Sequence, residues 1–537
     1  MTKNGTGPAG HGLEFDNVLD MFAATVARDP DRDLIRYGEA RLTARRVDEL
    51  SDAFAVGLAG LGLRPGDRAV LYMQNVPQFV IAQLGIWKAG AIAVSANPMY
   101  KDRELAEILR DSGATVLVAL ESLYRAVAAE VVPETDVRAT ILVSEQDFRA
   151  PDDSYGTTGT AGAATVWMGE LLRANDGRRP GAHAPGPHDI ALLTYTSGTT
   201  GPPKGAMTTH RNLVFNAQTY RDWVGIDSRD VIFGVAPLFH ITGIVGHVGV
   251  VLLTGAPLLL MCRFDAEQAV DLIARHRATF TVGSITVFIA IMNAPNASRD
   301  TLGSLTKIYS GGAPIPPRVI AEFGDRCGGY IHNIYGLTET TSPALAVPFG
   351  THAPVDDESG AVSVGVPVYD TVIRVVDDGG TEVPGGQPGE LVISGPQVVA
   401  GYWNKPEATA AAIPEGALHT GDVGYVDDDG WFYIVDRKKD QINASGFKVW
   451  PREVEDVLYE HPAVREAAVV GVPDSYRGET VKAFVTLRGD AGATPAELIG
   501  FARERLAAYK VPREVVLLPE IPKTASGKIL RRQLRDA

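Results

Sequence analysis

Residues 195–205 read Tyr195-Thr196-Ser197-Gly198-Thr199-Thr200-Gly201-Pro202-Pro203-Lys204-Gly205, after a short apolar run (190–193) and before a helical pattern that begins near His210. The three glycines of the stretch allow the backbone to bend and to approach a ligand closely. Its serine and threonine hydroxyls can donate hydrogen bonds, and Lys204 adds a positive charge. We therefore predict that this stretch binds a polyphosphate.

A flexible surface loop is the competing interpretation, because Gly, Ser, Thr and Pro are common in loops. Residues 157–162 have a similar composition but no lysine, no preceding strand and no following helix, and we predict a loop there. The Walker A motif is excluded, since Lys204 is followed by glycine rather than by serine or threonine. A phosphate site at 195–205 would therefore belong to a different fold.

The length, net charge and cysteine content of the chain exclude several classes of protein. A chain of 537 residues is too long for one hydrophobic core, so we expect two or more domains. Fifty Lys and Arg against 65 Asp and Glu give a net charge of −15 without a basic stripe, which argues against a nucleic-acid partner. The two cysteines, Cys262 and Cys327, lie far apart and in no metal-ligand spacing, so a disulfide or zinc framework is not expected.

The sequence also bears on location. Residues 1–12 are rich in glycine and polar residues, and we expect a disordered tail there rather than a signal peptide. The apolar stretch 244–261 is interrupted by Gly, His, Thr and Pro, so a transmembrane segment is not expected. With the two unpaired cysteines, these features predict a cytoplasmic enzyme.

The first two thirds of the chain alternate β-type runs with helical patterns. Residues 67–72 and 90–94 are expected to be strands, and 77–88 a helix with Pro77 in its first turn. Five further strands are expected at 231–235, 257–261, 279–283, 307–310 and 330–334, with helices such as 265–276 between them. This alternation predicts an α/β fold with doubly wound parallel sheets. Ligands of such folds bind beyond the carboxyl ends of the strands, where the loops after residues 195, 235, 310 and 334 are expected to converge.

The last third has a different pattern. From about residue 362, short β runs joined by tight turns predict an antiparallel, barrel-like β subdomain over 362–435. The charged run 436–440 precedes a compact α+β segment. We therefore predict a large N-terminal domain over 13–435, a hinge at 436–440 and a small, mobile C-terminal lid domain over 441–537. From its charge alone, the run 436–440 is equally compatible with a solvated linker.

Five motifs occur in this order: 195–205, Tyr335-Gly336-Leu337-Thr338-Glu339-Thr340, Thr420-Gly421-Asp422, Asp436-Arg437-Lys438-Lys439-Asp440, and Pro522-Lys523-Thr524-Ala525-Ser526-Gly527-Lys528. Together they resemble the adenylate-forming superfamily of acyl-CoA synthetases, peptide-synthetase adenylation domains and beetle luciferases, from about residue 15 to the end. The resemblance implies an ATP-dependent ligase that activates a carboxylic acid as its acyl-adenylate and then transfers it to coenzyme A. Its cofactors and co-substrates would be ATP, Mg²⁺ and CoA.

The resemblance also implies the nucleotide-binding residues. The phosphates would be held by the first motif, through Thr196, Ser197, Gly198, Thr199, Thr200 and Lys204. Adenine would lie against Gly312, Ala313 and Pro314 and against Asn333, Ile334, Tyr335 and Gly336. The ribose hydroxyls would contact Asp422 and Arg437. Glu339, with the Thr338 hydroxyl nearby, would bind Mg²⁺, which prefers one or two carboxylates with phosphate oxygens and water. A lone glutamate in a first helical turn could instead simply complement the helix dipole.

Four residues near the carboxyl end complete the implied machinery. Lys528 matches the lysine that bridges the acid carboxylate and the α-phosphate, although a tail lysine without the resemblance would be read as solvated. Lys439 matches the hinge about which the small domain rotates between the two steps. Ser445 and Gly446 resemble the stretch beside pantetheine in the second step. Some family members carry lysine where Asn443 stands, so that position departs from the pattern.

The sequence gives the least information about the residues that bind the carboxylic acid. His240 matches the aromatic residue that lines or gates the acyl site, with a histidine in a helix cap as the alternative. The neighbouring candidates are small and imply a deep or wide apolar pocket: Thr242, Gly243, Gly246, Gly283, Ser284, Gly311 and Gly312. We therefore expect a medium- or long-chain fatty acid or another bulky apolar acid. An aryl acid, loading of a carrier protein, luciferase-like oxidation and a non-catalytic binding protein remain alternatives, and a homodimer is compatible with the sequence.

Overall fold

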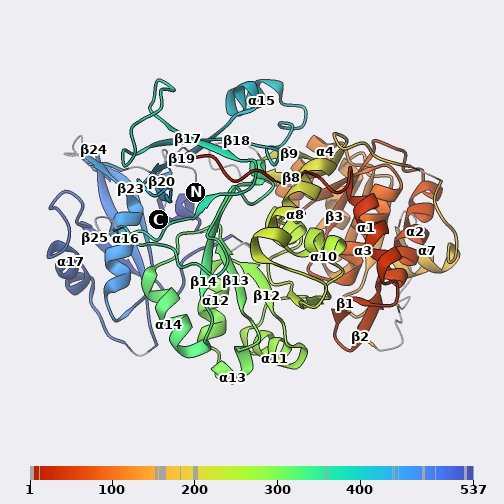
Figure 1. Ribbon diagram of the computed structural model, residues 1–537, viewed down its shortest axis with the longest axis horizontal. Helices are drawn as coiled ribbons and strands as arrows, with labels where there is room; N and C mark the ends of the chain where they lie inside the picture. The colour runs from red at the N-terminus through yellow and green to blue at the C-terminus, as the bar shows by residue number, and fades with distance from the viewer. Residues whose placement is uncertain are drawn as a thin grey trace.

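The computed structural model describes residues 5–10, 12–150, 155, 165–181, 183–196, 203–356, 360–437, 440, 442–444, 447–474, 478–489, 491–524 and 529–535. Across this described part of the chain the strands form four sheets. Figure 1 shows the elements from α1 to α7, in red to orange, on the right and the C-terminal region, in blue, on the left. The mixed α/β architecture predicted from the alternation of strands and helices is confirmed.

The first large sheet has seven strands within the described residues. Its order is β7 (Thr165–Trp167), β6 (Ala139–Val143), β5 (Val116–Leu120), β3 (Arg68–Tyr72), β4 (Ile92–Ser95), β8 (Ile190–Thr196) and β9 (Lys204–Thr209). All neighbours pair in parallel except β8 and β9, which are antiparallel, with Thr196 opposite Lys204. The glycine-rich stretch therefore joins two strands of a hairpin, and an unexpected strand separates it from the predicted helix at His210.

The second large sheet has nine strands within the described residues. Its order is β16 (Val366–Pro367), β15 (Leu345–Ala346), β14 (Ile331–Tyr335), β13 (Lys307–Gly311), β12 (Phe280–Gly283), β10 (Ile232–Phe233), β11 (Leu258–Leu260), β1 (Asp33–Tyr37) and β2 (Ala40–Thr43). The strands from β14 to β1 pair in parallel, and antiparallel strands flank them at both ends. The five strands predicted between 231 and 334 are confirmed.

Helices connect the parallel strands and cover the sheets. The longer ones are α1 (Val18–Arg28), α2 (Ala44–Gly60), α3 (Pro77–Lys88), α4 (Asp102–Ser112), α7 (Met168–Ala174), α8 (His210–Val224), α11 (Ala266–His276), α12 (Ile285–Met292) and α14 (Pro317–Cys327). Short helical turns are α5 (Glu121–Leu123), η1 (Tyr124–Ala128), α6 (Ala129–Val131), η2 (Val132–Glu134), α9 (Ile241–Gly243), η3 (Ile244–Gly249), α10 (Val250–Thr254), α13 (Arg299–Leu302), η4 (Thr338–Thr340) and η5 (Pro414–Gly416). The bounds of α3 match the prediction, and Asp265 caps α11 by accepting a hydrogen bond from the Gln268 amide.

One hydrophobic cluster joins the two large sheets. It contains buried side chains of β3 and β5 from the first sheet and of β1, β11 and β12 from the second, with α2, α3 and α8 between them. Phe54, Phe79 and Val80, for example, are completely buried in it. Because both sheets share this core, their carboxyl edges are held in a fixed relation to each other.

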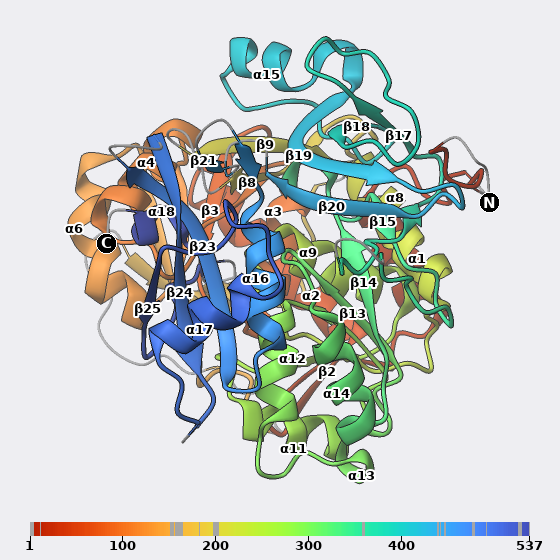
Figure 2. The ribbon, with the colours of Figure 1, turned by 90° about the vertical axis from the view of Figure 1, so that its left-hand side faces the viewer.

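The chain beyond residue 371 forms two smaller sheets, and Figures 1 and 2 show the first of them with α15 (Pro406–Ala412) at the top of the molecule. The four antiparallel strands of the first are β17 (Val372–Val376), β18 (Gly389–Ser394), β19 (Leu418–Val426) and β20 (Phe432–Arg437). The second contains β22 (Phe447–Val449), β21 (Ile442–Ala444), β24 (Gly478–Leu487), β23 (Val464–Asp474) and β25 (Glu514–Leu517). Its helices are α16 (Pro451–Glu460), α17 (Pro495–Arg503) and α18 (Arg531–Arg535), of which α16 packs against β23.

The described part of the amino-terminal segment is ordered, which contradicts the prediction of a disordered tail over 1–12 for those residues. Residues 5–10 lie along β17: Thr6 forms an antiparallel bridge with Val372, and the Gly7 amide donates to the Thr371 carbonyl at 2.7 Å. A side chain at Gly7 is excluded, because a Cβ there would lie 1.8 Å from the Val368 carbonyl oxygen. The glycines that suggested disorder therefore permit a close backbone approach.

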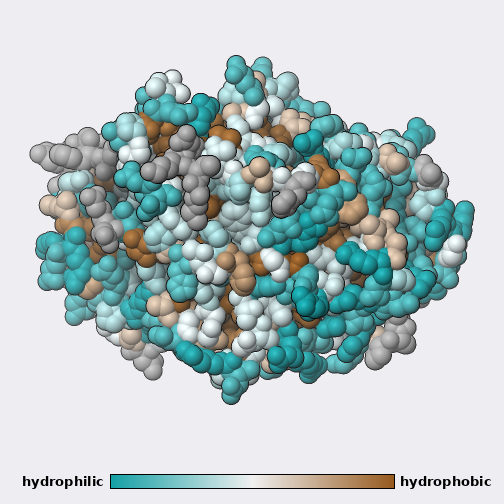
Figure 3. All heavy atoms as spheres, in the orientation of Figure 1, coloured by the Kyte–Doolittle hydropathy of each residue, from teal (hydrophilic) through white to brown (hydrophobic). Residues whose placement is uncertain are grey.

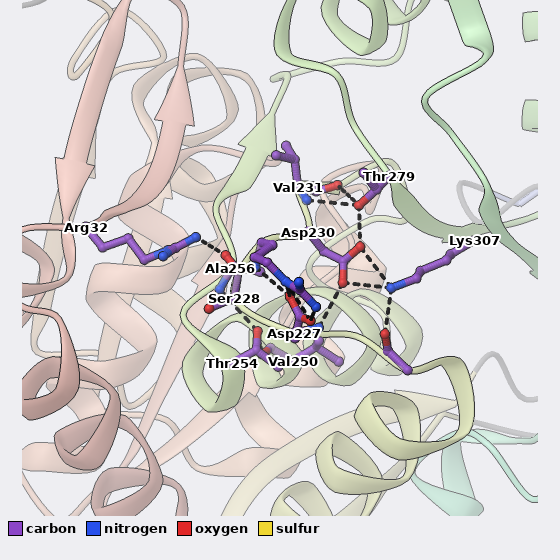
Figure 4. Close-up of polar contacts among 12 residues, drawn as sticks. Arg32, Asp227, Ser228, Asp230, Val231, Val250, Thr254, Ala256, Thr279 and Lys307 are labelled. Atoms are coloured by element: carbon purple, nitrogen blue, oxygen red, sulfur yellow. Dashed lines mark hydrogen bonds and ion pairs between the residues drawn. The ribbon is translucent and has the colours of Figure 1, made fainter.

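A polar cluster ties the amino ends of three parallel strands together at the edge of the second sheet away from the predicted site (Figure 4). Lys307, which begins β13, donates to both carboxylate oxygens of Asp230 at 2.8 and 2.9 Å and to the Gly225 carbonyl at 2.6 Å. Thr279, just before β12, donates to the same carboxylate at 2.7 Å. The Lys307 and Asp230 side chains are only 15% and 9% exposed, so water does not replace these bonds readily.

Three further features are the hydropathy of the surface, the apolar content of the helices and the state of the two cysteines. On the face drawn in Figure 3, hydrophobic residues form small patches among hydrophilic ones. None of the helices in the described part of the chain is long and apolar enough to cross a membrane. Cys262 and Cys327 are both free thiols in the structure.

The Lys307–Asp230 cluster predicts a large and local effect on stability. Lys307→Ala leaves a nearly buried carboxylate without its cation, and we expect the free energy of unfolding to fall by about 3 kcal/mol, measured by urea denaturation. Arg229→Ala is the matched control, because the neighbouring Arg229–Asp227 ion pair is exposed, and its urea midpoint should stay close to the wild-type value. Equal midpoints for the two variants would show that the cluster does not tie the strands.

Candidate active site

The carboxyl edges of the two large sheets meet at η4. This turn follows β14 and contains Glu339, and it packs against both β8 and β9 of the other sheet. The chain after β8 and the turn after β14 therefore meet, as expected for these two of the four predicted loops, and they join two sheets. The Asn216 side-chain amide, from α8, holds η4 in place by donating to the Thr340 and Thr341 carbonyls at 3.0 and 2.8 Å.

A short segment, residues 399–405, lies alongside β9 at this junction. The Met207 amide donates to the Gly401 carbonyl at 2.9 Å, and the Trp403 amide donates to the Gly205 carbonyl at 2.8 Å. The Val399 amide also donates to the Glu339 carbonyl at 3.0 Å. Segment 399–405 is thus hydrogen-bonded both to the strand that begins with Lys204 and to the turn that carries Glu339.

Tyr402 of this segment contacts both predicted site residues. Its hydroxyl donates to Oε1 of Glu339 at 2.6 Å, and the Lys204 ammonium lies 5.1 Å from the centre of its ring. Burial is the main cause that raises the pKa of Tyr402 above its ordinary value, and the nearby Glu339 carboxylate raises it further. The phenol therefore stays protonated and donates the hydrogen bond. The sequence reasoning missed Tyr402, because no local pattern relates residues 339 and 402.

The other end of the segment anchors the strand before the glycine-rich loop. The Tyr195 hydroxyl donates to Oδ2 of Asp111 at 2.8 Å, and the Lys405 ammonium pairs with Oδ1 of the same carboxylate. Burial and the bond to Asp111 raise the pKa of Tyr195. Asp111, from α4, therefore connects β8 and segment 399–405 beside the hairpin.

The predicted adenine and ribose residues form a second group. The Tyr335 hydroxyl donates to Oδ2 of Asp422 at 2.7 Å, and Asp422 lies directly opposite Arg437 in the β19–β20 pairing. Gly311 pairs with Ile334, which places Gly312, Ala313 and Pro314 beside the end of β14. Only three residues of chain separate Tyr335 from Glu339, so the two groups are adjacent. The Asn333 side chain is buried and donates to the Ser363 carbonyl at 3.1 Å.

The predicted acid-site residues make local contacts within α9 and the strands around it. His240 caps α9, where its Nδ1 accepts a hydrogen bond from the Thr242 amide at 3.3 Å, which is the helix-cap geometry held open as the alternative. Three of the small residues are needed for close packing instead of forming open space. A Cβ at Gly243, Gly246 or Gly311 would lie 2.2 to 2.7 Å from Pro237 O, Val282 Cγ1 or Ile334 O. These glycines therefore do not indicate a wide pocket by themselves.

A buried histidine lies on the same segment as His240. His247, in η3, is completely buried, and its Nε2 accepts a hydrogen bond from the Ala236 amide at 3.1 Å. Burial lowers its pKa to about 3, so it is neutral throughout the physiological range. The imidazole therefore fixes the 234–240 loop as a neutral acceptor and is unsuited to acid–base work.

Part of the predicted site lies outside the described residues. This applies to Ser197, Gly198, Thr199, Thr200, Lys439, Ser445, Gly446 and Lys528, and to the side chain of Arg437. The structure thus brings together Thr196, Lys204, Thr338, Glu339, Asn333, Ile334, Tyr335, Gly336, Gly312, Ala313, Pro314 and Asp422. No cluster of three or more His, Cys, Asp or Glu side chains suited to a metal occurs among the described residues.

Comparison with known proteins identifies the class. The model of the AMP-binding enzyme family matches residues 22–403, and the model of the AMP-binding enzyme C-terminal domain matches residues 453–528. A long-chain-fatty-acid–CoA ligase of Bacillus subtilis (strain 168) is 38% identical, over 98% of this chain and 96% of its own length. A feruloyl-CoA synthase of an Amycolatopsis species is 35% identical, over 94% and 96%.

A solved structure supports the same conclusion. The anthranilate CoA ligase in complex with anthranoyl-AMP superposes with a TM-score of 0.88 at 27% identity, over 98% of this chain and 97% of that one. The chain therefore belongs to the AMP-binding enzyme family, and within it to the acyl-CoA ligases.

The buried His247 predicts a pH-dependent stability. Its folded pKa lies below its unfolded value of about 6.5, so the unfolded chain binds the extra proton and stability falls as pH drops below 6.5. Between pH 7.5 and 5.5 this one group should cost about 1.4 kcal/mol. Urea denaturation of His247→Gln should show that much less loss than the wild type over this interval. The exposed His188 is the control, and His188→Gln should keep the wild-type loss; an unchanged loss in His247→Gln would contradict the assignment.

Proposed function

We propose that this protein is an AMP-forming carboxylic acid–CoA ligase whose acid is a medium- or long-chain fatty acid or a similarly bulky apolar acid. The acid carboxylate attacks the α-phosphorus of ATP, pyrophosphate leaves, and the CoA thiol then attacks the acyl-adenylate to give acyl-CoA and AMP. The contact of Lys204 and Glu339 with one tyrosine is the observation that carries the proposal. In the described part of the chain neither side chain has an ion-pair partner, which leaves a cation and a carboxylate available to a ligand.

The nucleotide would lie across the two adjacent groups of residues. Lys204, with the hydroxyl and amide groups of residues 196–200, would hold the β- and γ-phosphates, which depart as pyrophosphate. Adenine would lie between residues 312–314 and the segment Asn333–Gly336. The Asp422 carboxylate can accept hydrogen bonds from both ribose hydroxyls, and Arg437, opposite it in the sheet, would support the same sugar.

Glu339 fits the requirements of a magnesium ion bound together with phosphates. Mg²⁺ prefers one or two protein carboxylates and takes its remaining ligands from phosphate and water. One oxygen of Glu339 is occupied by Tyr402, and the carboxylate has no cation partner among the described residues. With the Thr338 hydroxyl beside it, Glu339 would hold the ion, which when bound supplies positive charge against the triphosphate.

The C-terminal residues would serve the two chemical steps. Lys528 would bridge the acid carboxylate and the α-phosphate, where two anions must meet and charge must be stabilised. Rotation about Lys439 would then replace Lys528 by the segment that contains Ser445 and Gly446, beside the pantetheine. His240 would line the acid site.

The comparisons support an apolar acid without naming one for this chain. The Bacillus subtilis relative is named for long-chain fatty acids, whereas the Amycolatopsis relative is named for the aryl acid ferulate at slightly lower identity. An aryl acid is therefore the second candidate. Loading of a carrier protein in place of free CoA is the alternative at the second step.

A panel of acids with ATP, Mg²⁺ and free CoA tests the proposal directly. AMP release should depend on CoA and should be fastest with fatty acids of medium or long chain. Faster turnover of ferulate or benzoate than of every fatty acid would favour the aryl alternative. The absence of CoA-dependent AMP release with any acid would contradict the proposal and favour a carrier protein as the acceptor.

Replacement of Lys528 should separate the two steps. Lys528→Ala should lower acid-dependent pyrophosphate release at least 100-fold, roughly the effect of losing one transition-state charge contact, yet leave much of the transfer from supplied acyl-AMP to CoA. Arg532→Ala removes an exposed charge nearby and serves as the control with near wild-type rates. Equal losses in both steps would contradict the assignment of Lys528 to adenylation alone.

A rigid residue at the hinge should have the opposite effect. Proline fixes φ and restricts the preceding residue, so Lys439→Pro should spare pyrophosphate release while it blocks acyl-CoA formation. Single-turnover assays of the two half-reactions measure this. Persistent acyl-CoA formation would show that the hinge lies at another residue.

A further inference from the structure

Tyr402 lies at the point where three segments of the candidate active site meet. It is 7% exposed and belongs to segment 399–405, which pairs with β9 and also bonds to the backbone of Glu339. The segment is anchored on the far side as well, by the Lys405–Asp111 pair that also engages Tyr195. The tyrosine is therefore held on a backbone that is fixed before any ligand binds.

We propose that Tyr402 is a positioning residue of the nucleotide and metal site, acting through Glu339 with its hydroxyl and through Lys204 with its ring. This inference rests on the proposed function, since it assumes that these two residues hold the metal and the phosphates. It adds a residue outside the phosphate, adenine, ribose and hinge motifs.

The Tyr402 hydroxyl fixes the orientation of the Glu339 carboxylate. A glutamate side chain has three rotatable bonds, and one strong hydrogen bond at 2.6 Å removes much of that freedom. Because Oε1 accepts from Tyr402, the carboxylate plane is oriented and Oε2 is left for the metal. Partners of this kind orient the metal ligands, and their loss typically weakens metal binding about 10- to 100-fold.

The Tyr402 ring holds the Lys204 ammonium in place. The Lys204 ammonium lies 5.1 Å from the ring centre, within the range of a cation–π contact. The contact holds the charge without neutralising it, so the ammonium remains available for an anion. An acidic partner at the same place would have attracted the lysine away from the phosphates, and an aliphatic residue would have left it free to point into solvent.

Two substitutions separate these roles, with a control elsewhere in the chain. Tyr402→Phe removes only the hydroxyl, and Tyr402→Leu removes the ring as well. Tyr433→Phe is the matched control, because Tyr433 is also buried and donates to a carboxylate, Asp427, at 3.1 Å in the β19–β20 hairpin. The full-length protein is used throughout, and melting temperatures are recorded for every variant.

The readout is direct binding, with Mn²⁺ as the probe. Electron paramagnetic resonance measures free Mn²⁺ in the presence of α,β-methylene-ATP, and a binding titration of the same nucleotide with excess Mn²⁺ measures its own affinity. Tyr402→Phe should weaken Mn²⁺ binding about 10- to 100-fold with a smaller effect on the nucleotide. Tyr402→Leu should weaken the nucleotide by roughly a further 3- to 10-fold. Tyr433→Phe should match the wild type in both.

A double-mutant cycle with Glu339→Gln tests whether Tyr402 acts through that carboxylate. In the Glu339→Gln background, Tyr402→Phe should cause little further loss of Mn²⁺ affinity. Equal losses in both backgrounds, wild-type Mn²⁺ affinity in Tyr402→Phe, or loss of the melting transition in Tyr402→Phe would each overturn the proposal. If the wild type itself bound neither Mn²⁺ nor the nucleotide, the proposed function would fail, which is a different result.

Discussion

The hydrogen bond between the Tyr402 hydroxyl and the Glu339 carboxylate joins parts of the chain that come from both large sheets. Glu339 follows the last parallel strand of the second sheet, whereas Tyr402 is held against β9 of the first. The shared hydrophobic core sets the two carboxyl edges near each other, and the hydrogen bond fixes their contact at a single carboxylate. A site built on this junction requires both sheets to be correctly packed, so the core residues far from the ligand also determine its geometry.

In the function proposed above, the rigid and the movable parts lie in different regions of the chain. Lys204, Glu339, Tyr335 and Asp422 lie on strands, or directly after them, in sheets that hold them before the ligand arrives. Pre-organised charges of this kind act without a reorganisation cost during the reaction. The residues proposed to act in only one step, Lys528 and Ser445 with Gly446, all lie beyond residue 440. A single nucleotide site can thus serve two reactions if only the small C-terminal region moves.

The sequence predicted what depends on local patterns and missed what depends on contacts across the fold. The helix Pro77–Lys88 and the strands around residue 308 were predictable, because proline at the first turn and apolar runs encode them locally. Strand β9 was missed because Lys204–Thr209 has no apolar alternation and is stabilised by its partner β8. Tyr402 could not be found, since its partner is 63 residues away. Glycines were misread in two ways, at Gly7 as disorder and at Gly243, Gly246 and Gly311 as open space, because glycine indicates close packing and flexibility equally well.

Isotope transfer tests the central claim, the formation of an acyl-adenylate, most directly. A fatty acid labelled with ¹⁸O in both carboxylate oxygens is turned over with ATP, Mg²⁺ and CoA, and the released AMP is examined by mass spectrometry. If the carboxylate attacks the α-phosphorus, the C–O bond breaks when the thiol attacks, and each AMP carries one ¹⁸O atom. AMP or ADP without the label, formed together with acyl-CoA, would contradict the account.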